Sequence, residues 1–290
     1  MSILKAILLG FVQGVTEFLP ISSSGHLSVF QHFLNVSNDT SLLFSVLLHL
    51  GTLVAVFIAY YKTIFELIKE FGLLIKDIFT GKFNWKERSE TRNMLFMFVI
   101  SCVPLLFLLI PVGNDRNLMD ILGSLAEDND IFVEGICLIF TAILLLAGTY
   151  RAKNISQPKS QMGPVEAFIV GIAQMLAAGF PGISRSGSTI STGMICGLKK
   201  EYMVRYSFIL GIPAILAANV LEIKDAVSEG AQVEILPVIL GVVTAAVVGF
   251  LAIKILEWLV KTDKFKFFAY YCFAAGAAVI IAAAIEKFAA

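Results

Sequence analysis

"FLPISSSGHL", residues 18–27, interrupts an apolar segment that would otherwise form a membrane helix. Pro20 cannot donate a backbone hydrogen bond inside a helix, and serines, a glycine and a histidine follow it closely. Non-helical backbone is tolerated at membrane depth only where it is buried in protein or lines a wet cavity. The stretch therefore predicts the polar tip of a re-entrant hairpin, between a half-helix that enters the membrane and one that leaves it.

The composition around this stretch indicates a membrane protein. Of the 290 residues, 58% are hydrophobic and 15% are charged, whereas a soluble domain carries about 25% charged residues. Stretches long enough to span a bilayer core of about 30 Å are 42–61, 94–112, 131–150, 203–222, 233–256 and 266–286. We predict an all-α polytopic membrane protein with these six transmembrane helices, and no nucleic acid partner.

A second interrupted stretch resembles the first, and the two cover 3–34 and 164–198. Gly10, Gln13 and Pro20 correspond to Gly171, Gln174 and Pro181, and after one extra residue, Gly182, residues 21–25 correspond to 183–187. Three predicted spans follow each interrupted stretch. We therefore predict two re-entrant hairpins in an internal repeat, with halves 1–155 and 156–290 in one integral membrane domain.

The repeat also predicts the topology. A re-entrant hairpin adds no net crossing, so each half crosses three times and the second half is inverted relative to the first. The two tips can then meet near the midplane. Lysines and arginines gather in the connections on one face, notably in 62–93, and the positive-inside rule makes that face cytoplasmic. Both termini and the opening of the first hairpin are expected outside, and 62–93 is interpreted as an interfacial amphipathic helix.

The cysteines and the N-terminus suggest no further chemistry. All four cysteines lie in apolar segments, so we interpret them as small core residues rather than a disulfide framework or a metal site. Glu17 interrupts the hydrophobic N-terminus and no small-residue cleavage site follows, so we expect mature sequence rather than a signal peptide.

Arg185 differs from the other basic residues because it lies inside an apolar repeat, in PGISRSGST. A guanidinium at that depth costs several kcal/mol unless it is paired or hydrated, and its fork fits phosphate oxygens. Each tip precedes a half-helix whose first amides form an anion site. The tips with Arg185 therefore predict a cradle for a phosphate or diphosphate; the alternative is a structural ion pair with Glu17.

The first hairpin carries the other candidate groups. Gln13 and Glu17 are four residues apart and share a helix face. Glu17 is suited to act as a general base, to orient His26, or to hold a divalent cation. His26 can reach the Ser23 hydroxyl or a leaving-group oxygen. His49 is either a neighbour of this site or a helix–helix hydrogen bonder, and we expect His32 to be interfacial and inert.

The pairing of QGVTEFLPISSSGHL with PGISRSGSTIS resembles the undecaprenyl-diphosphate phosphatase family of bacterial membranes, the bacitracin-resistance type. The resemblance covers essentially the whole chain. It implies six spanning helices with two re-entrant hairpins, in the bacterial inner (plasma) membrane. It also implies hydrolysis of undecaprenyl diphosphate to undecaprenyl phosphate and inorganic phosphate, with a divalent cation (Mg²⁺ or Ca²⁺), at a site facing the outside. Expected partners are the lipid substrate, the bilayer and a second copy in a homodimer.

The family motifs fall on catalytic candidates Glu17, Ser23, His26 and Arg185, with Glu17 also the expected metal ligand. Ser23 is favoured as the nucleophile because the repeat places it opposite Arg185, with His26 as acid/base; His26 or an activated water fits equally well. The expected substrate-binding residues are Gln13, Ser22, Ser24, Gly25, Ser184, Ser186, Gly187 and Thr189. The sequence departs from the family at Gln13, where glutamate is common, and an amide cannot act as a general base.

Two other functions fit parts of the pattern. A transporter or flippase of an isoprenoid diphosphate or another anion would use the same inverted repeat and midplane site. An intramembrane serine hydrolase would use Ser23 and His26, although Arg185 and Glu17 have no evident role in peptide cleavage. Phosphate release distinguishes the predicted hydrolase from both.

Overall fold

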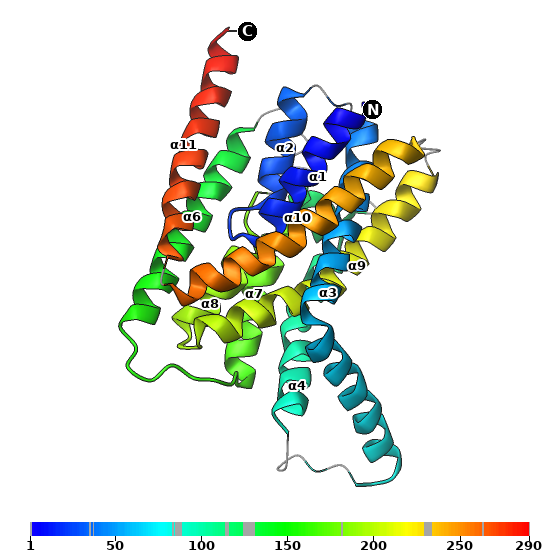
Figure 1. The fold of residues 1–290 in the computed structure, drawn as a ribbon, viewed down its shortest axis with the longest axis vertical. Helices are drawn as coiled ribbons and strands as arrows, with labels where there is room; N and C mark the ends of the chain where they lie inside the picture. Colours follow the sequence, from blue (N-terminus) through cyan, green and yellow to red (C-terminus); the bar gives the residue numbers. More distant parts are fainter. Residues whose placement is uncertain are drawn as a thin grey trace.

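The computed structural model describes residues 2–34, 36, 38–82, 84, 89–113, 116–123, 131–180, 182–228, 234–262 and 264–289, and its described part is almost entirely helical (Figure 1). The elements are α1 (Ile3–Phe18), α2 (Ser23–Phe33), α3 (Asn38–Phe79), α4 (Glu90–Cys102), the 3₁₀ helix η1 (Val103–Leu109), β1 (Pro111–Gly113), β2 (Arg116–Asn117), α5 (Leu118–Gly123), α6 (Phe132–Lys153), α7 (Pro164–Gly179), α8 (Arg185–Ile195), α9 (Lys200–Ser228), α10 (Ile235–Lys261) and α11 (Lys266–Ala289).

Six helical segments in the described part of the chain are long and apolar enough to cross a membrane. They are Leu43–Phe79, Glu90–Leu109, Phe132–Lys153, Lys200–Val220, Ile235–Lys261 and Lys266–Phe288. Each overlaps one predicted span, so a polytopic helical membrane protein is confirmed. All four cysteines are free, and Cys137 and Cys272 are buried among apolar side chains, as predicted.

The two interrupted stretches each form a pair of short helices. Helices α1 and α7 have 16 residues each, and α2 and α8 have 11 each. A membrane-spanning helix needs about 20 residues, so none of the four is long enough to cross alone. In Figure 1, α1 begins near the upper end of the molecule and the connection into α7 runs along the lower end. In this view α1 therefore starts above the region where the short helices meet, and α7 starts below it.

A helix is present in the first part of the predicted segment 62–93, where α3 extends as far as Phe79. A kink at Tyr60 redirects the helix (φ −119°, ψ 24°). Beyond it, Ile64 and Leu67 are buried, whereas the exposed side chains include both lysines, such as Lys62, and large apolar residues, such as Phe65 and Ile68. Residues 83 and 85–88 lie outside the described part of the chain, and the interfacial position of this segment stays a prediction.

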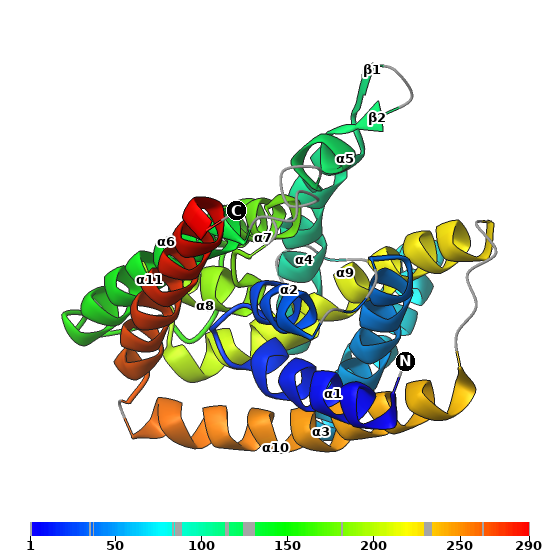
Figure 2. The ribbon, with the colours of Figure 1, turned by 90° about the horizontal axis from the view of Figure 1, so that it is seen from above.

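The end of the predicted span 94–112 is wrong in detail. Pro104 lies in the 3₁₀ segment η1, where a proline removes one of the backbone donors that an α-helix requires. The helical structure ends at Leu109, and Pro111–Gly113 then pairs antiparallel with Arg116–Asn117. Figure 2 shows this small sheet projecting from the helical body beyond α5. The all-α prediction did not include this sheet.

Helix α1 is positioned by very close packing against α10 (Figure 2). A Cβ atom on Gly10 would collide with the carbonyl oxygen of Gly241, and one on Gly14 would lie 2.9 Å from the carbonyl oxygen of Ala245 and the amide of Gly249. Small residues four apart on both helices let the two backbones approach, the packing that membrane helices favour. This contact fixes the height and rotation of α1.

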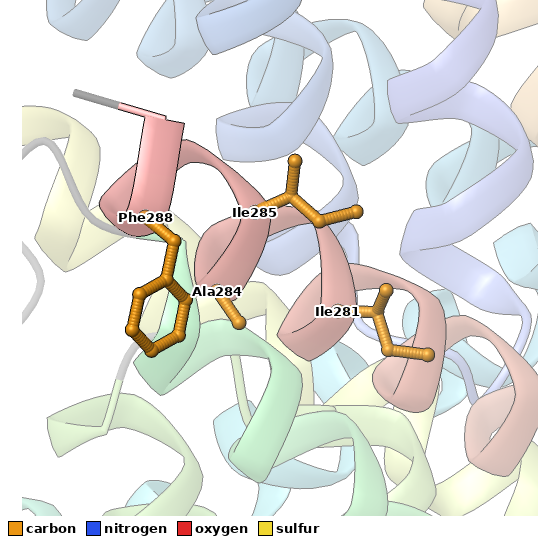
Figure 3. Close-up of a pocket in the computed structure, with 4 residues that line it drawn as sticks. All are labelled: Ile281, Ala284, Ile285 and Phe288. Atoms are coloured by element: carbon orange, nitrogen blue, oxygen red, sulfur yellow. The ribbon is translucent and has the colours of Figure 1, made fainter.

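The outer surface is strongly apolar, as expected of helices that face lipid. The C-terminal part of α11 is an example, because Ile281, Ala284, Ile285 and Phe288 line a shallow hollow on it (Figure 3). None of these side chains carries a polar group. The hollow therefore cannot be a site of chemistry, and the reactive side chains lie elsewhere, at the tips of the two short-helix pairs.

Candidate active site

The two helix breaks are built in the same way. Ser22 precedes α2, and its Oγ accepts a hydrogen bond from the Gly25 amide at 3.2 Å. Ser184 precedes α8, and its Oγ accepts from the Gly187 amide at 3.0 Å. Both serines are N-caps. Ser22 has φ +70°, a left-handed conformation that costs a non-glycine residue about 1–3 kcal/mol and is typical of functional sites.

The two tips contact each other, as the repeat predicted. The Gly182 amide donates to Ser24 Oγ at 3.2 Å, and Ser186 Oγ donates to the Leu19 carbonyl oxygen at 3.4 Å. Gly182 has φ +95°, a conformation that favours glycine. Pro181, the repeat partner of Pro20, lies outside the described residues. The tips thus bring residues of the two halves of the chain into one small polar region.

Glu17 is the centre of this region. It lies in the last turn of α1 and is buried. One carboxylate oxygen, Oε1, accepts from Arg185 Nη2 at 2.7 Å. The other, Oε2, accepts from Ser23 Oγ at 2.6 Å and from Gln13 Nε2 at 3.1 Å. The donors Arg185, Ser23 and Gln13 all favour the ionised form of the Glu17 carboxylate.

Ser23 is placed to act as a nucleophile. Its Oγ is within hydrogen-bond reach of a carboxylate that can take its proton, the geometry that activates a serine hydroxyl. Ser23 is partly exposed, and Ser24 beside it is exposed, whereas Ser184, Ser186, Gly187 and Thr189 are buried. The open side of the site is therefore formed by the first tip, and the second tip supports it from behind.

Arg185 connects the two halves through its guanidinium. Nη2 pairs with Glu17, and Nη1 donates to the carbonyl oxygen of Ser207 on α9 at 3.1 Å. Thr189 stabilises this arrangement, because its Oγ1 lies 2.6 Å from Ser207 Oγ and donates to the Arg185 carbonyl oxygen. Gly211 leaves room for the guanidinium, with which a Cβ atom there would collide. The ion pair with Glu17 that the sequence offered as an alternative is present, within a larger network.

The hydrogen-bond partners of His26 differ from those of Glu17. Its Nδ1 is 2.7 Å from the Ser22 carbonyl oxygen, and its Nε2 is 2.7 Å from the Tyr271 hydroxyl on α11. The hydrogen bonds of the described residues therefore join Glu17 to Ser23 and join His26 to Ser22 and Tyr271. This geometry favours Glu17 as a partner of Ser23 over Glu17 as the orienter of His26.

A model of the family described as bacitracin resistance protein BacA matches residues 6–278 of this chain. This chain belongs to the BacA family. A protein of Alkaliphilus metalliredigens and one of Methanosphaera stadtmanae are each 38% identical to it over 291 residues, with 97% of this chain and 98% of the relative covered. A protein of Treponema denticola is 38% identical over 275 residues, covering 93% of this chain and 94% of the relative. All three relatives are named undecaprenyl-diphosphatase.

The cation expected for a BacA-family protein can be compared with the donors present. Among the described residues no group of three or more histidine, cysteine or acidic side chains could hold a metal ion. Two oxygens do suit a hard cation: the Glu17 carboxylate and the buried Gln13 Oε1, which has no hydrogen-bond partner among the described residues. Mg²⁺ is commonly held by one or two protein oxygens together with substrate phosphates. The site fits a cation shared with a diphosphate.

The other two histidines and one tyrosine complete the description of this BacA-family chain. His49, whose role the sequence left open, lies with Nε2 3.6 Å from Glu17 Oε2 and is a neighbour of the site. His32 forms an ion-pair contact of 3.2 Å with Glu286 on α11, away from the tips. Tyr271 was not predicted, because it lies on an apolar helix with an adjacent tyrosine and no motif around it.

Proposed function

We propose that this protein hydrolyses undecaprenyl diphosphate to undecaprenyl phosphate and inorganic phosphate. This reaction recycles the lipid carrier for cell-wall synthesis and is associated with bacitracin resistance. One observation carries the proposal: Ser23 Oγ lies 2.6 Å from Glu17, and Glu17 is ion-paired with Arg185 of the other half of the chain. The contacts thus join a nucleophile, a base and a guanidinium that can bind phosphate. They do so in a BacA-family chain whose relatives are named undecaprenyl-diphosphatase.

The first chemical step begins at Ser23. As its Oγ attacks the terminal phosphorus, the proton passes to Glu17 Oε2, which already accepts it in a hydrogen bond. The bond from the phosphorus to the bridging oxygen breaks, and undecaprenyl phosphate leaves. Arg185 and the first amides of α2 and α8 stabilise the charge on the phosphoryl oxygens. Phosphoryl transfer depends mainly on such positioning and charge neutralisation.

The second step releases phosphate from Ser23. A water molecule attacks the phosphorus of the phosphoserine and gives a proton to a base at the tip, the bond from the phosphorus to the Ser23 oxygen breaks, and Glu17 returns its proton to that oxygen. His26 is suited to that base because its Nε2 faces the open side of the tip, where Tyr271 reaches it. Glu17 and Gln13 Oε1 would hold the divalent cation, which would neutralise diphosphate charge and orient the reacting phosphate.

The membrane arrangement forms part of the proposal. The α1–α2 and α7–α8 pairs are re-entrant hairpins of an inverted repeat with halves 1–155 and 156–290, which their equal lengths and opposite points of entry support. The site opens on the outer face of the inner membrane, with both termini outside, which the basic residues of 62–93 support. The isoprenoid tail lies along lipid-facing helices, and a homodimer remains a prediction.

Phosphate release tests this function directly. The purified full-length protein in detergent is given undecaprenyl diphosphate and Mg²⁺, and inorganic phosphate is measured with and without a chelator. We expect release from the native protein, less release with chelator, and almost none from Arg185→Ala. Absence of release from any long-chain isoprenyl diphosphate would contradict the proposal and favour a transporter, which vesicles containing the protein would reveal by moving the lipid unchanged.

A further inference from the structure

Tyr271 makes a specific contact with His26 across a large separation in sequence. Its hydroxyl lies 2.7 Å from His26 Nε2, and the two rings stack with 5.6 Å between centroids and 14° between planes. Tyr271 belongs to α11, which is 245 residues away along the chain. A single tyrosine therefore contacts the Nε2 edge of the imidazole, with its ring nearly parallel to it.

The other edge of the imidazole determines which nitrogen is free to react. His26 Nδ1 lies 2.7 Å from the Ser22 carbonyl oxygen, and a carbonyl only accepts hydrogen bonds, so Nδ1 carries the hydrogen. In the neutral ring Nε2 is then an acceptor, and the Tyr271 hydroxyl donates to it. Ser22 is itself held in a left-handed conformation by the tip. The tip and α11 together therefore select one tautomer and one ring orientation.

Tyr271 is held in place by other contacts of α11 with the first hairpin. The next residue, Cys272, is fully buried, and its Sγ lies 3.6 Å from the Pro20 carbonyl oxygen. Near the end of α11, Glu286 meets His32 of α2 at 3.2 Å. Helix α11 packs mainly on α6, and these two contacts add direct links from α11 to the first hairpin, on either side of Tyr271 in the sequence.

We propose that Tyr271 is a positioning residue for His26, holding Nε2 as the acceptor at the open side of the site. Substrate or the hydrolytic water takes over the hydrogen bond from the tyrosine during the reaction. This inference rests on the proposed phosphatase function for its consequence, although the contact itself does not. It adds α11 to a site whose other reactive groups all come from the two hairpins.

The matched pair Tyr271→Phe and Tyr270→Phe tests this role. Phenylalanine keeps the ring and its stacking and removes only the hydroxyl. Tyr270 is similarly exposed (53%, against 46% for Tyr271) and faces Phe267. We expect Tyr271→Phe to lower kcat for phosphate release about tenfold with KM within about twofold, because a misplaced acid/base raises the barrier. Tyr270→Phe should retain native kinetics.

A spectroscopic readout separates positioning from a merely structural role. The chain has three histidines, so a ¹⁵N spectrum of protein labelled only at histidine is simple, and a His26→Gln variant assigns the His26 signals. We expect Tyr271→Phe to move the His26 Nε2 resonance and leave those of His32 and His49 in place. In a His26→Gln background, Tyr271→Phe should cause no further loss of activity, because residues that act through one another are non-additive.

Three results would overturn the proposal: an unmoved Nε2 resonance, a native kcat in Tyr271→Phe, or an equal loss of kcat in Tyr270→Phe. If the native protein released no phosphate, the proposed function would fail separately. The Nε2 resonance would then decide whether Tyr271 holds His26.

Discussion

Ser23 Oγ lies 2.6 Å from Glu17 Oε2, and this contact closes the break between α1 and α2. The two groups are six residues apart, on either side of a proline and a serine in the left-handed conformation. A continuous helix would place residues six apart on different faces. The break therefore creates the contact between the proposed nucleophile and its proposed base.

Replacing Ser23 with alanine should abolish catalysis without unfolding the protein. Loss of the nucleophile is expected to lower kcat for phosphate release at least about 1,000-fold, with a melting temperature close to native because Ser23 is only partly buried. The control is Ser28→Ala, which removes a hydroxyl of the same helix that donates to Glu134 instead. A Ser23→Ala enzyme with near-native rate would favour His26 or water as the nucleophile.

The Glu17–Arg185 pair should contribute to both stability and activity. Arg185→Ala leaves the buried Glu17 carboxylate without its cation, which we expect to cost about 3 kcal/mol of unfolding free energy. Adding Glu17→Gln removes the stranded charge, so the double variant should recover part of the melting temperature while remaining inactive. Thermal unfolding in detergent measures the first effect and phosphate release the second; a double variant less stable than Arg185→Ala would contradict this account.

Arg185→Lys distinguishes geometry from charge. The guanidinium pairs with Glu17 and donates to the Ser207 carbonyl oxygen at the same time, whereas an ammonium is a point charge without the fork. We expect the lysine variant to unfold near the native temperature and to lose about 100-fold or more in kcat/KM. Native kcat/KM in this variant would show that charge alone is sufficient.

Gln13 offers a test of the cation site. Gln13→Glu would add a second carboxylate one helical turn from Glu17, and like charges at this distance favour a bound divalent cation. The Mg²⁺ concentration for half-maximal activity should fall about fivefold, which corresponds to about 1 kcal/mol. Gln13→Leu, which lacks the oxygen, should raise it. Equal Mg²⁺ dependence in both variants would exclude residue 13 from the cation site.

The packing of α1 on α10 should be sensitive to a single side chain. Gly10→Ile would force apart backbones that already meet at the Gly241 carbonyl oxygen, and overpacking of this kind costs about 1–3 kcal/mol. Activity should also fall, because α1 carries Glu17. Phe11→Leu is the control, since the neighbouring Phe11 is exposed. Melting temperature and phosphate release measure both effects, and a native melting temperature in Gly10→Ile would show that α1 can shift at no cost.

Much of this architecture was predictable because hydropathy and backbone chemistry act locally. Pro20 and the serines after it mark the first break, and the 161- and 162-residue offsets located its counterpart. The extension of α3 to Phe79 was not predicted, because charged residues interrupt its apolar run after the kink at Tyr60. The β1–β2 pair was missed because two short strands leave almost no periodic signal.

The meeting of the two tips was predictable from the sequence, but not all of the side-chain pairings there. Burial of charge at depth required a partner for Arg185, and Glu17 was the available carboxylate. Whether Glu17 meets Ser23 or His26 depends on the left-handed turn at Ser22, which a serine rarely adopts and a sequence does not reveal. Tyr271 was hidden because an aromatic residue on an apolar helix ordinarily faces lipid or core.

The equal lengths of α1 and α7, and of α2 and α8, have a consequence for direction. Two identical tips would present two equivalent sites, one for each side of the membrane. When the two halves are aligned, however, Glu17 corresponds to Ala178 and Ser23 corresponds to Arg185. The first half carries the carboxylate and the serine hydroxyl, and the second half carries the guanidinium. For the proposed inverted repeat, this difference predicts an enzyme with one entrance, which processes lipid from a single leaflet.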